Sequence, residues 1–187
     1  MVMGGVERGV VGRWRHEVVH PAATFILEIG AGTGLNFPHY SATAMVVATD
    51  RSLAMLKRGR KRVADADASI MLVVADAESL PFRDDAFDEA VAVLVMCTIP
   101  HADRALAEMG RTLRAGGALR LLEHVRLEHP FAGWLQDALT PFWRRVAGGC
   151  CLNRRTVGSI AEAGFTVGTV DRELGGYVLR ILARKPK

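Results

Sequence analysis

Short apolar runs that end in polar or glycine-rich turns constrain the fold of this chain more than any other feature. Residues 25–29 form such a run and end at a glycine cluster, which is how a buried parallel strand passes into a tight turn. Similar runs occupy 45–49, 70–74, 90–94 and 118–122. Helical patterns lie between several of them. Strands that alternate with helices predict an α/β domain with a mostly parallel sheet.

The helical patterns have recognisable ends. Ser52 can cap a helix over 53–64, and Asn153 can cap a helix over 154–163. An amphipathic pattern over 101–114 stops before Gly116-Gly117. A short helix over 13–22 is expected to end near Pro21, and two last strands are expected at 165–170 and 177–183.

Length and composition set the remaining limits. The chain has 187 residues, half of them hydrophobic, so we expect one domain over 1–187 that begins with a helical segment over 1–24. The net charge of +4 is mild and spread along the chain. Three cysteines, two of them adjacent, do not suggest a disulfide framework, and no spacing suggests zinc, so we expect no bound metal. Without a signal peptide or membrane span, the expected location is the cytoplasm.

The first strand turn carries the strongest chemical signal. Gly30, Gly32 and Gly34 allow a sharp turn and the close approach of a ligand. Asp50 ends the next strand, where its carboxylate can accept hydrogen bonds from ribose hydroxyls. A plain tight turn remains an alternative. A dinucleotide site is another, although its fingerprint places a third glycine where this chain has Leu35.

The third apolar run ends at Asp76-Ala77. The Asp76 carboxylate could accept from an adenine amino group, and the backbone N–H of Ala77 could donate to the ring. Together with "LPFRDDAFDEAVAVLVM" and "RTLRAGGALRLLE", these segments resemble the class I methyltransferases that use S-adenosylmethionine. The resemblance covers nearly the whole chain. It implies a Rossmann-like fold with a seven-stranded, mostly parallel sheet whose last strand is antiparallel.

The same resemblance implies a set of cofactor-binding residues. The first motif spans the glycine turn. The acidic residue that binds the ribose is followed by an arginine. The backbone near the end of the fourth strand receives the cofactor's amino group. The implied residues are Glu28, Gly30, Ala31, Gly32, Gly34, Asp50, Arg51, Asp76, Ala77 and Val93.

A narrower resemblance follows the fifth strand. "LLEHV", "WLQDALTPFW" and "GGCCLNRRTV" are similar to the methyltransferase-like 7 proteins, which are thiol methyltransferases. The N-terminal membrane anchor of their animal members is not expected in this chain. The resemblance implies a small thiol as the methyl acceptor; a small O- or C-acceptor, such as a quinone precursor, is the alternative.

Residues 125–152 are too long for an ordinary connection in an α/β unit. The segment follows the carboxyl end of a strand, where ligands bind in such folds, so we interpret it as a substrate-side lid. Trp134, Trp143 and Cys150 are its candidate substrate-binding residues. The alternative is an aromatic stripe that packs on the edge of the sheet.

His124 ends the fifth run, near the expected position of the methyl group. It could take a proton from the acceptor or orient it, or it could be a hydrogen-bonded histidine at a strand end. No partner base for Cys150 and Cys151 is evident in the sequence, so they are interpreted as small buried apolar groups. Cys97 is expected to line the pocket.

Other classes of function fit less well. The basic run over 57–62 lies on a predicted helix without interleaved aromatic residues, which favours a solvated face over nucleic-acid binding. A nicotinamide-dependent oxidoreductase conflicts with the glycine spacing. A module that binds the cofactor without catalysis stays open, and the sequence does not indicate the oligomeric state.

Overall fold

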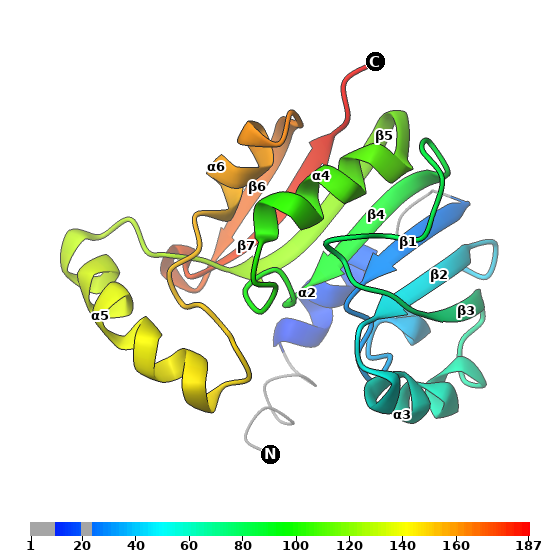
Figure 1. Cartoon of the computed structure of the whole chain (residues 1–187), viewed down its shortest axis with the longest axis horizontal. Coiled ribbons are helices and arrows are strands. Elements are labelled where there is room, and N and C mark those ends of the chain that lie inside the picture. Colours follow the sequence, from blue (N-terminus) through cyan, green and yellow to red (C-terminus); the bar gives the residue numbers. More distant parts are fainter. Residues whose placement is uncertain (1–9, 20–23) are drawn as a thin grey trace.

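The computed structural model describes residues 10–19 and 24–187, and its seven strands form a single sheet (Figure 1). The strands are β1 (Phe25–Ile29), β2 (Met45–Asp50), β3 (Ser69–Val74), β4 (Phe87–Val93), β5 (Leu113–His124), β6 (Thr166–Glu173) and β7 (Val178–Arg184). Their order is β3-β2-β1-β4-β5-β7-β6. The first five run parallel, and β7 is antiparallel to both neighbours. This confirms the Rossmann-like arrangement expected from the sequence.

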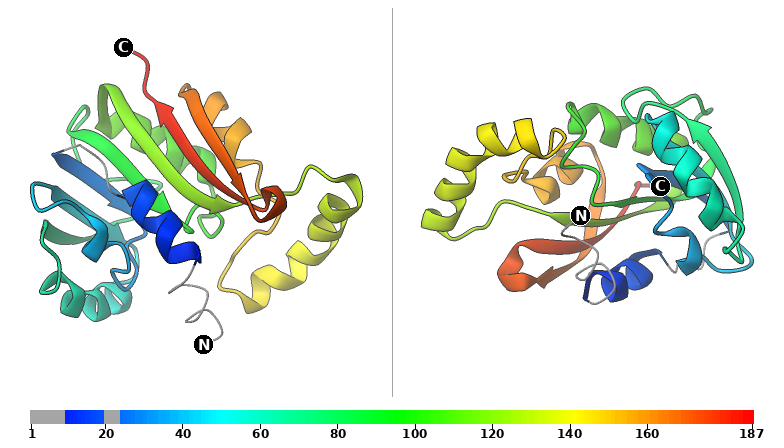
Figure 2. Two further views of the ribbon diagram at one scale, coloured as in Figure 1. Left: turned by 180° about the vertical axis from the view of Figure 1, so that it is seen from behind. Right: turned by 90° about the horizontal axis from the view of Figure 1, so that it is seen from below.

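Helices cover both faces of the sheet (Figure 2). The helices are α2 (Val10–Val19), α3 (Leu53–Val63), α4 (Ala102–Thr112), α5 (Pro130–Val146) and α6 (Thr156–Glu162), with short 3-10 turns η1 (Phe37–His39) and η2 (Leu174–Gly176). One buried cluster joins α4 and α6 to the sheet, and a second joins α2, α3 and η1 to its other face. The two clusters make the sheet the centre of the core.

Each predicted strand run coincides with a strand, except that Leu94, Phe165 and Tyr177 at their ends lie just outside β4, β6 and β7. Ser52 caps α3 as expected, because its hydroxyl accepts from the backbone N–H of Met55 at 3.3 Å. β5 begins at Leu113, earlier than predicted, and includes Gly116 and Gly117. The predicted helix over 101–114 therefore ends at Thr112. Pro21, where the first helix was expected to end, lies outside the described residues.

One predicted cap is wrong. Asn153 does not cap α6, which begins at Thr156 after Arg155. Its side-chain amide instead donates to Asp137 of α5 at 2.9 Å. Because this hydrogen bond ties the Asn153 side chain to α5, the side chain is not free to cap the N-terminus of α6.

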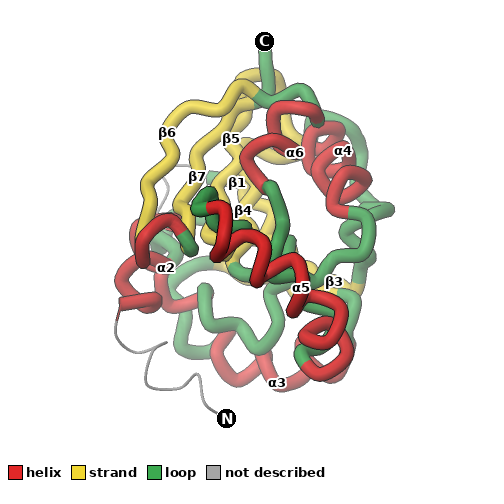
Figure 3. Tube along the Cα trace, turned by 90° about the vertical axis from the view of Figure 1, so that its left-hand side faces the viewer, coloured by secondary structure: helices red, strands yellow, loops and turns green. Residues whose placement is uncertain are grey.

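The predicted lid segment is mainly a helix. α5 lies beyond the carboxyl end of β5 and, seen from that side, crosses in front of the sheet (Figures 1 and 3). Extended connections on either side join it to β5 and α6. Within the described part of the chain, no helix is long and apolar enough to cross a bilayer.

Candidate active site

The glycine turn after β1 adopts a conformation that side chains would not permit. Gly30 has φ +67°, and a Cβ atom there would lie 2.2 Å from Cγ2 of Val95. Gly34 has φ +79°, and its Cβ would lie 2.4 Å from the ring of Phe37. Real Cβ contacts are never this short, so both positions require glycine in this backbone. The turn is thus packed tightly on one side and leaves its backbone open on the other.

Asp50 fixes this turn. Its Oδ2 accepts from the N–H of Gly32 at 2.9 Å, and its Oδ1 accepts from the N–H of Ser52 at 2.7 Å. Each carboxylate oxygen has two lone pairs, so both oxygens keep capacity for another donor. The carboxylate is therefore held in place and can still accept from a ligand.

A pocket opens at the carboxyl ends of β1, β2, β3 and β4, where ligands bind in open α/β sheets. Five of the expected cofactor-binding residues come together there: Gly30, Asp50, Arg51, Asp76 and Ala77. Asp76 is oriented by the N–H of Glu78, which donates to Oδ1 at 2.9 Å. The pocket is completed by Ile29, Thr49, Ala75, Val95, Thr98, Ile99 and Pro100.

Other expected cofactor-binding residues lie outside the lining of the pocket. Ala31, Gly32 and Gly34 belong to the turn itself but do not line the pocket. Val93 is buried in β4, and Val95, two positions further along, forms the wall in its place.

Glu28 is fully buried, does not line the pocket and contacts the segment that follows the turn. Its Oε1 accepts from Asn36 Nδ2 at 2.7 Å, and its Oε2 accepts from the Tyr40 hydroxyl at 3.0 Å. Arg15 of α2 donates in turn to the side chain of Asn36. Burial raises the pKa of Glu28 to about 7, although the hydrogen bonds from Asn36 and Tyr40 oppose this. The network connects α2 to the glycine turn.

A second group of polar side chains lies where β4 and β5 end. His124 Nε2 is 3.1 Å from Cys150 Sγ, and the donor atoms of Cys97, His124 and Cys150 all lie within 4.8 Å of one another. The backbone keeps the three segments together, because the N–H of Cys151 donates to the carbonyl of Cys97 at 2.8 Å. Tyr177 stacks on the His124 ring with centroids 5.5 Å apart.

These contacts separate the pKa values of the two thiols. The hydrogen bond from Cys97, followed by that from His124, holds the pKa of Cys150 below its usual range. The same bond to Cys150, with burial, raises the pKa of Cys97. Burial acts to lower the pKa of His124, but the hydrogen bond and charge of Cys150 outweigh it, so this pKa is raised. The Cys150 thiol therefore ionises more readily than a free thiol.

This pairing corrects the interpretation of the cysteines. Cys150 was expected to be a small buried apolar group without a partner base, but it is only partly buried and has His124 beside it. The chain separation of 26 positions hides the pair in the sequence. α5 and the turn after it bring Cys150 back to the end of β5.

The two tryptophans of the segment have different surroundings. The Trp143 side chain lies near Cys150 and helps to lower the pKa of its thiol. Trp134 is 60% exposed on α5 and has its nearest aromatic neighbour in Phe131, with ring centroids 6.0 Å apart. Among the expected substrate-binding residues, the structure therefore brings Trp143 and Cys150 to His124, but not Trp134.

The loop after β4 separates the pocket from the cluster. Val95 and Thr98 line the pocket, and Cys97 between them belongs to the cluster. Glu123 fixes this loop, since its Oε1 accepts from the N–H groups of Val95 and Met96 at 2.7 and 2.8 Å. The pocket residues Val95 and Thr98 were not predicted from the sequence. Their place directly after an apolar run, like that of Asp50 and Asp76, is the signal that could have found them.

Comparison with known proteins identifies the family to which this fold and this site belong. Residues 27–121, just over half of the chain, match the methyltransferase domain family. The chain belongs to this family.

Curated relatives include methyltransferases with different acceptors. The thiol S-methyltransferase TMT1B of Homo sapiens is 32% identical over 155 residues, which cover 79% of this chain and 62% of that protein. The ubiquinone/menaquinone biosynthesis C-methyltransferase UbiE of Bordetella avium is 40% identical over 111 residues, 57% of this chain and 43% of that protein. The chain thus spans less than two thirds of the length of these relatives.

Solved structures share the fold at low sequence identity. The [4+2]-cyclase SpnF has a TM-score of 0.74 at 19% identity, covering 93% of this chain and 80% of the other. An S-adenosylmethionine-dependent methyltransferase from Mesorhizobium loti has a TM-score of 0.71 at 17% identity, covering 95% and 99%. A cyclase and a methyltransferase are thus similar to the chain to the same degree, so this likeness concerns the fold alone.

Proposed function

We propose that this chain transfers a methyl group from S-adenosylmethionine to a small thiol. The observation that carries the proposal is the position of the Cys97–His124–Cys150 cluster on the far side of a loop that also lines the Asp50–Asp76 pocket. A donor site and a site suited to a sulfur-containing acceptor would then share one wall.

The residues of the pocket fit this cofactor. Asp50 would hold the ribose hydroxyls with its remaining acceptor capacity, and Asp76 and Ala77 would hold the adenine. Gly30 would leave room for the methionine part, because its backbone lines the pocket without a side chain. When bound, S-adenosylmethionine supplies an electrophilic methyl group on a sulfonium sulfur. The main task of the chain is to align acceptor and donor in a site closed to water.

His124 is the residue that we assign to the acceptor. The cluster already accommodates a sulfur atom, Cys150 Sγ, at 3.1 Å from its Nε2. An acceptor thiol that took over this contact would find a nitrogen able to receive its proton. A free thiol has a pKa of about 8.5, so a strong base is hardly needed. Trp143 would supply an apolar wall beside Cys150.

A second candidate acceptor is a small quinone-like metabolite methylated on carbon or oxygen. It is supported by the similarity to the UbiE C-methyltransferase and to a demethylmenaquinone methyltransferase of Renibacterium salmoninarum, 34% identical over 143 residues. Such an acceptor would need more help from a base than a thiol does, and His124 would again be the candidate.

Methyl transfer from labelled S-adenosylmethionine to a panel of small thiols, with matching alcohols, phenols and quinols, tests the proposal. We expect labelled thioether from the wild-type chain and none from Asp50→Ala. His124→Asn should lower kcat, whereas Cys151→Ser, adjacent to the cluster, should not. Cofactor binding with product from quinols alone would remove the thiol assignment, and an unchanged kcat in His124→Asn would remove the role of this residue.

A further inference from the structure

α5 presents an unusual surface. Its large apolar side chains recur three or four positions apart and face outward. They form what we call the α5 outer face: Phe131, Trp134, Leu135, Leu139, Phe142 and Val146, all exposed. Scattered exposed apolar residues are normal, but a continuous row on one helix marks an interaction site.

The inward side of the same helix is polar, and its contacts fix the orientation of the helix. Gln136 is buried; its Oε1 accepts from the N–H of Leu127 at 2.7 Å, and its Nε2 donates to the carbonyls of Val125 and Leu152 at 3.1 and 3.0 Å. Asp137 forms an ion pair with Arg126 at 2.9 Å. A rotation that buried the outer face would break all of these contacts, so α5 is held with this face exposed in the part of the chain that the structure describes.

The charges around α5 indicate what would bind this face. Arg144 and Arg145 lie in the last turn of the helix and have no ion-pair partner in the part of the chain that the structure describes. The two acidic side chains nearest in sequence are already paired, Asp137 with Arg126 and Glu128 with Arg172. An apolar face rich in phenylalanine and tryptophan, with unpaired arginines at one end, matches the boundary between lipid headgroups and acyl chains.

We propose that the α5 outer face docks on the surface of a lipid bilayer that contains anionic lipids. The helix would lie in the plane of the surface, with its apolar side chains between the acyl chains and Arg144 and Arg145 among the headgroups. α5 has 17 residues and a polar inward side, which suits this position and not a span. The proposal is independent of the acceptor and of the methyl transfer.

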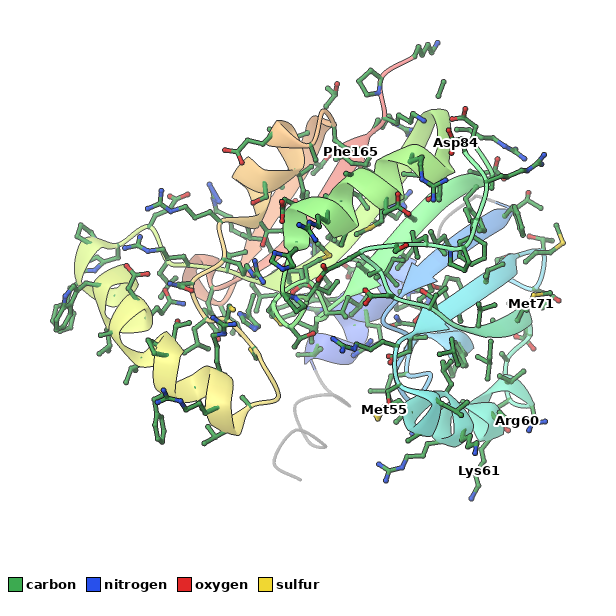
Figure 4. All side chains as sticks on the ribbon, in the orientation of Figure 1. Met55, Arg60, Lys61, Met71, Asp84 and Phe165 are labelled. Carbon is green, nitrogen blue, oxygen red and sulfur yellow. The ribbon has the colours of Figure 1, made fainter. Side chains whose placement is uncertain are left out.

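Sedimentation of the full chain with lipid vesicles tests the proposal. The vesicles are made of phosphatidylcholine alone or of phosphatidylcholine mixed with phosphatidylglycerol. The test variant is Phe131→Ser/Phe142→Ser, and the matched control is Met71→Ser/Leu174→Ser. The exposed fractions are similar, 66% and 65% against 63% and 63%, but Met71 lies on β3 at the opposite end of the molecule from α5 (Figure 4).

We expect wild type and the Met71/Leu174 control to bind the phosphatidylglycerol vesicles equally and the phenylalanine variant to bind at least about tenfold more weakly, because two buried aromatic side chains are lost. Arg144→Glu/Arg145→Glu should remove most of the preference for phosphatidylglycerol. Absence of binding, or equal loss in both serine pairs, would overturn the proposal. Concentration-dependent dimers that disappear in the phenylalanine variant would overturn it in favour of a second copy of the chain.

Discussion

At the scale of single residues, Asp50 and Asp76 line one pocket although they come from different strands. Asp50 and Asp76 were recognisable because each directly follows an apolar run, and parallel strands bring such positions to one edge. The partner of Cys150 was not recognisable, because contacts between distant segments depend on the path of the chain. Glu28, which the resemblance placed among the cofactor-binding residues, does not line the pocket, and its carboxylate accepts from Asn36 and Tyr40.

The lowered pKa of Cys150 leads to a prediction about ionisation. Thiolate absorbance followed against pH should show one group in the wild type that ionises below the usual value of about 8.5, because Cys97 and His124 stabilise its thiolate. Cys150→Ser should lose this group, His124→Asn should move its midpoint upward, and Cys151→Ser should keep it. If the titrations of wild type and Cys150→Ser coincide, the thiolate is not on Cys150.

At the scale of elements, the strands were predictable and α5 was not. Buried strands show continuous apolar runs in the sequence, and each of these runs was confirmed. α5 lies in a segment interpreted as a lid, since its apolar side chains suggested a wall over the acceptor. The inward contacts of Gln136 are the physical reason that those side chains face outward instead.

Gln136 should matter more for stability than its polar character suggests. Gln136→Leu would leave one N–H and two carbonyl groups without their partner, so we expect a loss of about 2–3 kcal/mol in the free energy of unfolding. Urea denaturation measures the loss, and hydrogen exchange should show that it is concentrated in 130–146. Thr140→Val, which removes a single bond to the carbonyl of Gln136 at 2.6 Å, is the control and should cost less. Equal losses would contradict this account of α5.

At the scale of the whole molecule, three buried carboxyl groups make stability depend on pH. Burial raises the pKa of Glu28, Glu89 and Glu123 to about 7. The folded state therefore binds protons that the unfolded chain, with a carboxyl pKa of about 4.3, has released. This contribution is complete below the unfolded pKa and is lost as the pH rises through the folded pKa, so stability should fall between about pH 4.3 and 7.

The variant Glu28→Gln separates the contribution of Glu28 to this pH dependence from the contributions of other groups. Between pH 5 and 8 the free energy of unfolding of the wild type should fall by up to about 3 kcal/mol more than that of the variant, because the amide has no proton to release. Denaturant unfolding at both pH values gives the comparison. Glu162→Gln, on the exposed end of α6, should follow the wild type. If the free energy of unfolding of Glu28→Gln falls with pH as steeply as that of the wild type, other groups carry the pH dependence.

The contact between Gly30 and Val95 joins the two halves of the site. Val95 occupies the space that a Gly30 side chain would need, and its N–H is held by Glu123, the residue before His124. A shift of the glycine turn upon cofactor binding would therefore reach the acceptor side through a single packed contact. Thermodynamic reciprocity then requires that the acceptor change the affinity for the cofactor by the same factor by which the cofactor changes the affinity for the acceptor.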